Sequence, residues 1–191
     1  MAREIKIVVL FSGNGSNLEN LIKHFHSKVF KDKKIQIIPI TNRPDAKGIE
    51  RAKKYGIDTI IIDHKEFKSR ESFDAKLVKI IKSFSPSLVV AAGFMRILTP
   101  VFTEQIKAIN LHPSLLPLFK GANAIEESFK SQMRVCGVTV HWISSKLDSG
   151  EIIEQECIKK TKEETLEEFE QKIHNLEYTI LPKSIKHILK L

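Results

Sequence analysis

Two residues in the middle of the chain suit acyl-transfer chemistry. In Asn110-Leu111-His112, an amide and an imidazole stand two residues apart, so on an extended backbone both face the same side. An amide N–H beside a protonated imidazole can stabilise a developing oxyanion and move a proton. Taken alone, the same pattern is more often a hydrogen-bonded turn that ends a strand, and both interpretations stay open at this point.

A second candidate site is the glycine-rich segment Ser12-Gly13-Asn14-Gly15-Ser16-Asn17, between a strand-like run and a helix-like run. Backbone N–H groups in such a turn, together with the positive end of the following helix, bind anions. Leu18 stands where a dinucleotide-binding fingerprint has its third glycine, and no Gly-Lys-Ser/Thr follows. The pattern therefore favours a single phosphate over a dinucleotide or ATP. The alternative is a plain tight turn with Ser16 or Asn17 as the helix N-cap.

The third candidate is Asp148, in the turn Leu147-Asp148-Ser149-Gly150. Turns favour aspartate for local reasons. A catalytic role therefore requires that its carboxylate reach His112, where it would orient the ring and favour the charged form. The remaining histidines form no metal-binding pattern, and Cys136 and Cys157 lack metal-ligand spacing. We expect no metal site.

Alternating strand and helix patterns must position these segments. We expect strands at residues 6–11, 35–41, 59–62 and 88–92. We expect helices at residues 18–25, 46–55 and 73–84, where apolar residues recur at helical spacing. Such alternation predicts an α/β fold: a Rossmann-like, mostly parallel sheet with helices on both faces.

The pattern changes after about residue 108. Residues 138–142 and 151–158 read as strands joined by the turn at Asp148, which predicts an antiparallel hairpin at the sheet edge. Thr165 and Glu168 form a capping box that begins a helix. We expect Pro182 to interrupt that helix and a short final helix to follow it.

The length of 191 residues fits one domain over residues 1–191. The net charge of +8 comes from 31 basic and 23 acidic residues spread along the chain. A dispersed solvated surface explains this charge better than attraction of a small anion or binding of nucleic acid. The apolar runs are far shorter than the about 20 residues that a membrane span needs. Two cysteines and no signal-peptide pattern favour a cytoplasmic protein.

Four segments together resemble the phosphoribosylglycinamide formyltransferase branch of the folate-dependent formyltransferase family. They are residues 9–18, 92–98, 110–117 and 147–150, and the resemblance runs from residue 5 to about 182. The segment 110–117 is shared by the wider family, whereas the glycine loop is more specific to this branch. The resemblance implies transfer of a formyl group from the co-substrate 10-formyltetrahydrofolate to the amine of glycinamide ribonucleotide, in purine biosynthesis and without a metal.

The resemblance also implies a role for each matching residue. The catalytic set would be Asn110, His112 and Asp148. The residues that bind the ribonucleotide would be Gly15, Ser16 and Asn17, at the phosphate, and Glu177, at the ribose or glycinamide end.

The folate site that the resemblance implies combines polar and apolar residues. They are Arg70, Met95, Arg96, Ile97, Leu98, Asn110, Ser144, Ser145, Lys146, Leu147 and Asp148. The chain departs from the family at Asn123 and Ile125, where the family commonly has histidines. The resemblance therefore does not define the loop around these two residues.

Two other formyl-folate enzymes and one binding protein are the alternatives. A formyltetrahydrofolate deformylase usually carries an extra N-terminal domain, and a methionyl-tRNA formyltransferase a C-terminal one. We expect neither, since the first strand begins by residue 5 and 191 residues leave no room. A nucleic-acid-binding module would need clustered Lys and Arg. We expect small-molecule substrates, no nucleic acid or membrane partner, and a monomer or homodimer.

Overall fold

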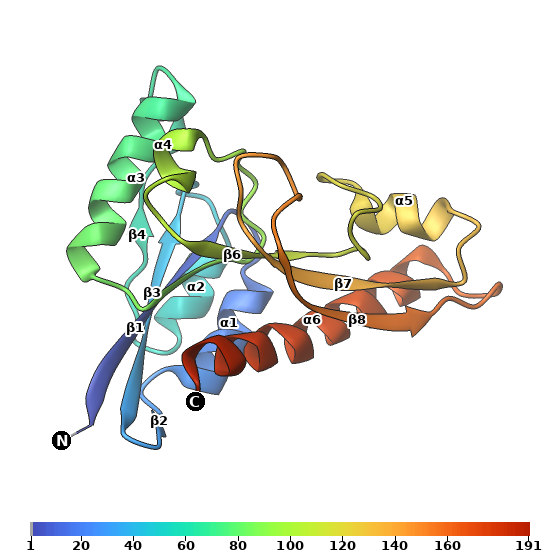
Figure 1. Ribbon diagram of the computed structural model, residues 1–191, viewed down its shortest axis with the longest axis horizontal. Helices are drawn as coiled ribbons and strands as arrows, with labels where there is room; N and C mark the ends of the chain where they lie inside the picture. The colour runs from blue at the N-terminus through green and yellow to red at the C-terminus, as the bar shows by residue number, and fades with distance from the viewer. Residues whose placement is uncertain (1) are drawn as a thin grey trace. The chain divides into compact units, whose positions relative to one another are not determined.

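The computed structural model describes residues 2–191, which form two compact units. The first unit contains the residues up to Ile109 together with Leu189–Leu191, and the second contains Asn110–Ile188 (Figure 1). Strands and helices alternate along the chain, so the predicted α/β class is confirmed. One domain over residues 1–191 stays a prediction.

The sheet of the first unit is mostly parallel, as predicted. Its strands are β1 (Arg3–Phe11), β2 (Val29–Phe30), β3 (Lys33–Thr41), β4 (Ile60–Ile61) and β5 (Leu88–Ala91). They lie in the order β2-β3-β1-β5, and β4 pairs with β3. β1 is parallel to both β3 and β5, and Ile7 lies beside Ile37 on one side and Leu88 on the other. The antiparallel strand β2 was not predicted, because a strand of two residues is too short to show an alternating pattern.

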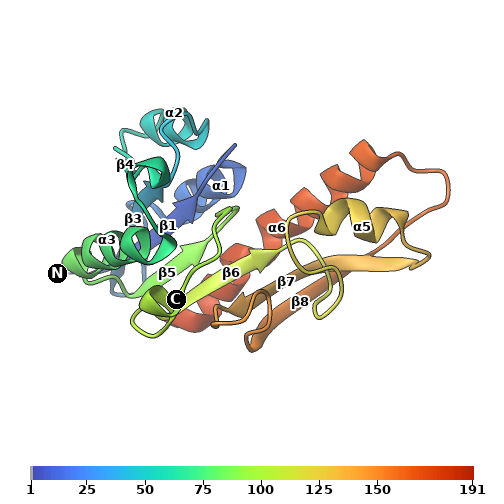
Figure 2. The ribbon, with the colours of Figure 1, turned by 90° about the horizontal axis from the view of Figure 1, so that it is seen from above.

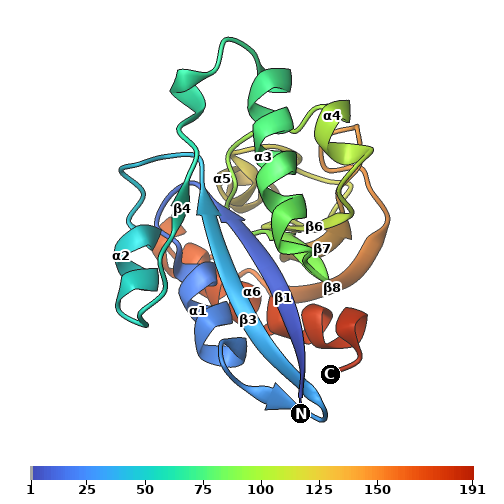
Figure 3. The same cartoon turned by 90° about the vertical axis from the view of Figure 1, so that its left-hand side faces the viewer.

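Helices cover both faces of this sheet. They are α1 (Ser16–Phe25), α2 (Gly48–Lys53), α3 (Arg70–Phe84) and α4 (Pro100–Thr103), with a 3₁₀ turn at His64–Glu66. Figures 1 and 3 show α1 and α2 on one face of β1 and β3 and α3 on the other. The apolar stripe that predicted α1, including Leu18 and Phe25, is fully buried. Burying such a stripe against a sheet is the main source of stability for a ten-residue helix.

The second unit contains the predicted hairpin. Its strands are β6, β7 (Val135–Trp142) and β8 (Ile152–Lys159), in the order β6-β7-β8. β6 (Ala108–His112) begins in the last residues of the first unit. β7 and β8 are antiparallel, with a bulge between Val140 and His141. Figure 2 shows these strands side by side. Successive side chains of a strand point to opposite faces. Because β7 ends near the turn at Asp148, every second side chain at its end points toward that turn.

The last helix contradicts the sequence prediction. α6 (Leu166–Leu189) is one continuous helix with Pro182 inside it. An internal proline costs about 3 kcal/mol because its ring removes one helical hydrogen bond. Three fully buried apolar residues flank it, Ile180, Leu181 and Ile185, and their burial outweighs that cost. The predicted capping box is confirmed, since the backbone N–H of Glu168 donates to the hydroxyl of Thr165 at 3.2 Å.

A buried lysine caps the C-terminal end of helix α5 (Ala124–Lys130). The ammonium of Lys160 donates to the carbonyl oxygens of Ser128, Phe129 and Ser131, at 3.0, 2.6 and 2.6 Å. These are carbonyls that a helix end leaves without an intrahelical partner. Lys160 therefore holds the segment that joins α5 to β7.

Within residues 2–191, the helices are too short or too polar to span a bilayer.

Candidate active site

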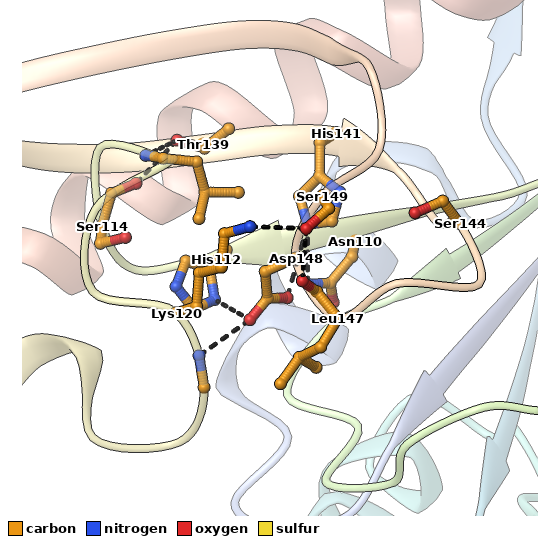
Figure 4. A network of polar contacts seen from close by, with 12 residues as sticks. Asn110, His112, Ser114, Lys120, Thr139, His141, Ser144, Leu147, Asp148 and Ser149 are labelled. Atoms are coloured by element: carbon orange, nitrogen blue, oxygen red, sulfur yellow. Dashed lines mark hydrogen bonds and ion pairs between the residues drawn. The ribbon is translucent and has the colours of Figure 1, made fainter.

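β6 places Asn110 and His112 on the same side of the second unit. His112 is buried and Asn110 half-buried, while Leu111 is buried on the opposite face of the strand. Figure 4 shows both polar side chains directed toward Asp148, which comes from the turn after β7. The structure therefore brings the three predicted catalytic residues together.

Both ring nitrogens of His112 face oxygen atoms. Nε2 lies 2.8 Å from the carbonyl oxygen of Phe119, which can only accept, so this nitrogen carries a hydrogen. Nδ1 lies 3.5 Å from Oδ2 of Asp148. One acceptor oxygen therefore faces each nitrogen of the ring and defines its orientation.

The carboxylate of Asp148 is held from several directions. Oδ2 accepts a hydrogen bond from the backbone N–H of Gly121 at 2.9 Å, besides facing His112. Oδ1 lies 3.7 Å from Nε2 of His141. Only 9% of Asp148 is exposed, and its φ of 45° is in the left-handed region that aspartate and asparagine tolerate best. The turn therefore fixes the direction of this carboxylate.

His141 is a neighbour of the site that the sequence analysis did not select. Its Nδ1 donates to the carbonyl oxygen of Trp142 at 2.9 Å, which leaves Nε2 as the acceptor of a neutral ring. The amide Nδ2 of Asn110 lies 3.2 Å from that Nε2. Burial lowers the pKa of His141 and outweighs the raising effects of the Trp142 carbonyl and of Asp148. His141 thus stays neutral at neutral pH and orients the amide of Asn110.

Two loops meet beside this set. The ammonium of Lys120 donates to the hydroxyl of Ser149 at 2.5 Å, and the hydroxyl of Ser149 donates to the carbonyl of Leu147 at 2.8 Å (Figure 4). Ser144 is half-buried, and the residues at 145–147, predicted to contact folate, are exposed, with Leu147 at 50%. The turn therefore presents one exposed apolar side chain next to the buried carboxylate of Asp148.

The glycine-rich segment lies in the first unit, before α1. Gly15 has a φ of 69° and is itself the N-cap position of α1. The alternative of a side-chain cap by Ser16 or Asn17 is wrong, because both residues lie within the helix. A Cβ at Gly15 would overlap the Cα of Gly48, at the start of α2. The glycine is therefore required by packing between α1 and α2, besides any contact with an anion.

Ser12 joins this loop to the predicted folate segment within the same unit. The buried hydroxyl of Ser12 accepts a hydrogen bond from the backbone N–H of Met95 at 2.8 Å and donates to Oδ1 of Asn42 at 2.5 Å. Exposure then alternates along the segment: Met95 and Ile97 are 69% and 50% exposed, while the residues at 96 and 98 are half-buried.

The two arginines predicted for folate differ in their surroundings. The guanidinium of Arg96 lies 5.0 Å from the centre of the Phe73 ring, a cation–π contact. Arg70 is exposed at the first position of α3. Arg96 is therefore held by its neighbours, whereas Arg70 presents its charge to solvent.

Glu177 lies on α6 in the second unit and is 5% exposed. One of its carboxylate oxygens lies 2.9 Å from Nδ1 of His174, and the hydrogen bond to Glu177 raises the pKa of His174.

Asn123 and Ile125, where the chain departs from the family that it resembles, lie at the start of α5. The carbonyl of Asn123 accepts the backbone N–H of Glu127 at 2.9 Å, so this segment begins a helix.

Across residues 2–191, no three His, Cys, Asp or Glu side chains gather as metal ligands.

Comparison with known proteins gives one consistent family. A family model described as formyl transferase matches residues 5–185. Phosphoribosylglycinamide formyltransferase of Bacillus subtilis is 34% identical over 188 residues, which cover 97% of this chain and 95% of that protein. A solved structure of phosphoribosylglycinamide formyltransferase from Campylobacter jejuni is 55% identical with a TM-score of 0.95, and covers 99% of this chain and 100% of that one.

The similarity extends to much longer proteins. The trifunctional purine biosynthetic protein adenosine-3 of Gallus gallus is 37% identical over 185 residues. These residues are 96% of this chain but 18% of that protein, so the chain spans less than a fifth of the length of such relatives.

The glycine contact makes a prediction about stability. Replacing Gly15 by alanine forces a side chain into a left-handed conformation and against Gly48, which should lower the free energy of unfolding by about 2 kcal/mol or more. Gly13 is the matched control, because a Cβ there meets open space, and Gly13→Ala should change stability little. Urea denaturation of the two variants checks this, and equal stabilities would show that Gly15 and Gly48 are not tightly packed.

Proposed function

The chain belongs to the formyl transferase family, and we propose that it transfers the formyl group of 10-formyltetrahydrofolate to the amine of glycinamide ribonucleotide, in purine biosynthesis. The observation that carries the proposal is the set of Asn110, His112 and Asp148 in the second unit, in which His112 and Asp148 are buried. Full-length similarity to phosphoribosylglycinamide formyltransferases supports the choice of acceptor.

The reaction requires a stabilised oxyanion and one proton transfer. The amine attacks the formyl carbon, a C–N bond forms, and the carbonyl oxygen becomes an oxyanion. The amide N–H of Asn110 and an N–H of His112 would donate to that oxygen, an arrangement worth several kcal/mol in a water-excluded site. The bond to the folate nitrogen then breaks, and the proton lost by the amine passes to that leaving nitrogen through a water molecule.

Phe119 indicates where the oxyanion would bind. Its carbonyl oxygen already accepts the Nε2 hydrogen of His112 at 2.8 Å. In our proposal the substrate oxygen takes over this hydrogen bond, so the loop that carries Phe119 gives way when substrates bind. Asp148 keeps its contact with the opposite nitrogen and stabilises the positive ring throughout.

Binding of the ribonucleotide would use the start of α1. The residues at 15–17 would receive the phosphate, since the first N–H groups of a helix lack intrahelical partners and its dipole favours an anion. Glu177 would bind the ribose hydroxyls or the glycinamide amine, for which its carboxylate is a suitable acceptor.

Binding of the folate would use apolar contacts and one charge. Met95 and Ile97 of the first unit, and Leu147 of the second, each expose an apolar side chain that can contact an aromatic ring. The exposed guanidinium of Arg70 would pair with a folate carboxylate. The remaining folate contacts in the proposal are Arg96, Leu98, Asn110, Ser144, Ser145, Lys146 and Asp148.

We further propose that the protein acts in the cytoplasm on small molecules, without nucleic acid or membrane, as a monomer or homodimer. The dispersed charge and the two free cysteines support this placement. A deformylase, with water as the formyl acceptor, is the alternative reaction of the same set. The glycine-rich loop favours a phosphorylated acceptor over water.

The formyl-transfer assay tests the proposed function. The chain is incubated with 10-formyltetrahydrofolate, with and without glycinamide ribonucleotide, and folate, formate and nucleotide are followed by absorbance and mass spectrometry. We expect folate consumption to require the ribonucleotide, which gains one formyl group for each folate converted. Formate released at the same rate without the ribonucleotide would indicate a deformylase and contradict the proposal. The His112→Ala variant, purified in parallel, reports contaminating activity.

His141 provides a test of how Asn110 is oriented. His141→Leu removes the acceptor at 3.2 Å from the Asn110 amide, so kcat should fall about tenfold with little change in either KM. His141→Gln can place an amide oxygen where Nε2 was, and should recover most of the activity. Melting temperatures identify any loss due to unfolding. Full turnover by a folded leucine variant, or equal losses in both variants, would contradict this positioning role.

A further inference from the structure

Arg51 of α2 holds the glycine-rich loop of the first unit. Its Nε donates to the carbonyl oxygen of Asn14 at 2.8 Å, and its Nη2 donates to Oδ1 of the same residue at 3.1 Å. A third nitrogen, Nη1, contacts the carboxylate of Glu19, in the first turn of α1. Figure 3 shows α1 and α2 side by side, so one guanidinium spans both the loop and the helix that follows it.

These contacts determine where the loop N–H groups point. The carbonyl of Gly13 accepts the N–H of Gly48 at 3.1 Å, and the carbonyl of Asn14 accepts from Arg51. In a planar trans peptide the C=O of one residue and the N–H of the next point in opposite directions. The N–H groups of Asn14 and Gly15 are therefore directed away from α2. Successive N–H groups aimed to one side at a helix N-terminus form an anion-binding nest.

Arg51 also compensates the charge next to this nest. The carboxylate of Glu19 contacts Arg51, lies 3.2 Å from the ammonium of Lys23, and accepts a hydrogen bond from the hydroxyl of Tyr55 at 3.1 Å. Burial raises the pKa of Glu19, but these hydrogen bonds outweigh it and lower the pKa, so the group is ionised. Without Arg51, this negative charge would oppose a phosphate at the start of α1.

We propose that Arg51 is a positioning residue for the phosphate of the ribonucleotide: it turns the loop N–H groups outward and neutralises Glu19. This rests on the proposed function, which places the phosphate at residues 15–17. Arg51 acts through Asn14 and Glu19, because its three guanidinium nitrogens are already hydrogen-bonded to these two residues.

Substitutions separate the two contributions. Arg51→Lys keeps the positive charge but loses the two-pronged contact with Asn14, because an ammonium lacks the planar fork. Arg51→Gln loses the charge as well. The double variant Arg51→Gln with Glu19→Gln removes the charge that Arg51 compensates. Arg43→Gln is the matched control, an arginine of the same unit that pairs with Asp45 two residues along.

The readout is kcat/KM for glycinamide ribonucleotide and for the riboside that lacks the phosphate, with the folate KM and melting temperature measured alongside. Arg51→Gln should lose about tenfold or more for the ribonucleotide, the scale of a charge-assisted hydrogen bond. Its kcat/KM for the riboside, its kcat and its folate KM should stay within about twofold. Arg51→Lys should lose less, the double variant should regain part of the loss, and Arg43→Gln should match the wild type.

Three outcomes would overturn the inference. Folded Arg51 variants that use the ribonucleotide as well as the wild type does would exclude a positioning role. Equal losses for ribonucleotide and riboside would indicate a general structural role. A wild type that forms product but does not distinguish ribonucleotide from riboside would remove the phosphate from this loop. Failure of the proposed function is distinct, since the wild type would then not transfer the formyl group at all.

Discussion

The buried carboxylate of Asp148 is the interaction on which the candidate active site depends. Removing a carboxylate from water is costly unless it is paired and hydrogen-bonded. Here the compensation comes from His112 on β6 and from the backbone N–H of Gly121. The same partners join a strand, a loop and a turn, so the charge to which we assign a role in the chemistry also determines where these segments meet.

Substrate binding and chemistry rest on different kinds of groups. The proposed phosphate loop relies on backbone geometry, with Gly15 packed on Gly48 and its preceding carbonyls bound to α2. The proposed catalytic set relies on side chains whose directions are fixed by their hydrogen-bond partners. His141 illustrates this, because the carbonyl of Trp142 selects the tautomer that can accept from Asn110.

The spacing of apolar residues predicted the helices and strands that bury one face. It failed where packing against the rest of the fold determines the local structure. The strands at β1, β3 and β5 and the stripe of α1 follow directly from runs of apolar residues. The prediction of a break at Pro182 was wrong because burial around it outweighs the lost hydrogen bond. Short elements such as β2 and α4 carry too few residues for a pattern.

The site could be predicted only in part for a related reason. Strand alternation placed Asn110 and His112 on one side, but the approach of Asp148 depended on resemblance, since a turn has no local signal for a distant partner. His141 was visible as a residue alternating along β7, and Arg51 as one more basic residue of a helix. Their importance lies in the residues they contact, Asn110 and Asn14, and one sequence does not specify those pairs.

The role of Asp148, to act through His112, is tested by measuring kcat and melting temperature for four proteins. They are the wild type, Asp148→Asn, His112→Ala and the double variant. Asparagine suits this test because it tolerates the φ of 45° and removes only the charge. Each single change should lower kcat by orders of magnitude in protein that remains folded at the assay temperature, and the double variant should be scarcely slower than the slower single variant. Losses that multiply, or an Asp148→Asn protein that melts earlier but turns over normally, would contradict the account.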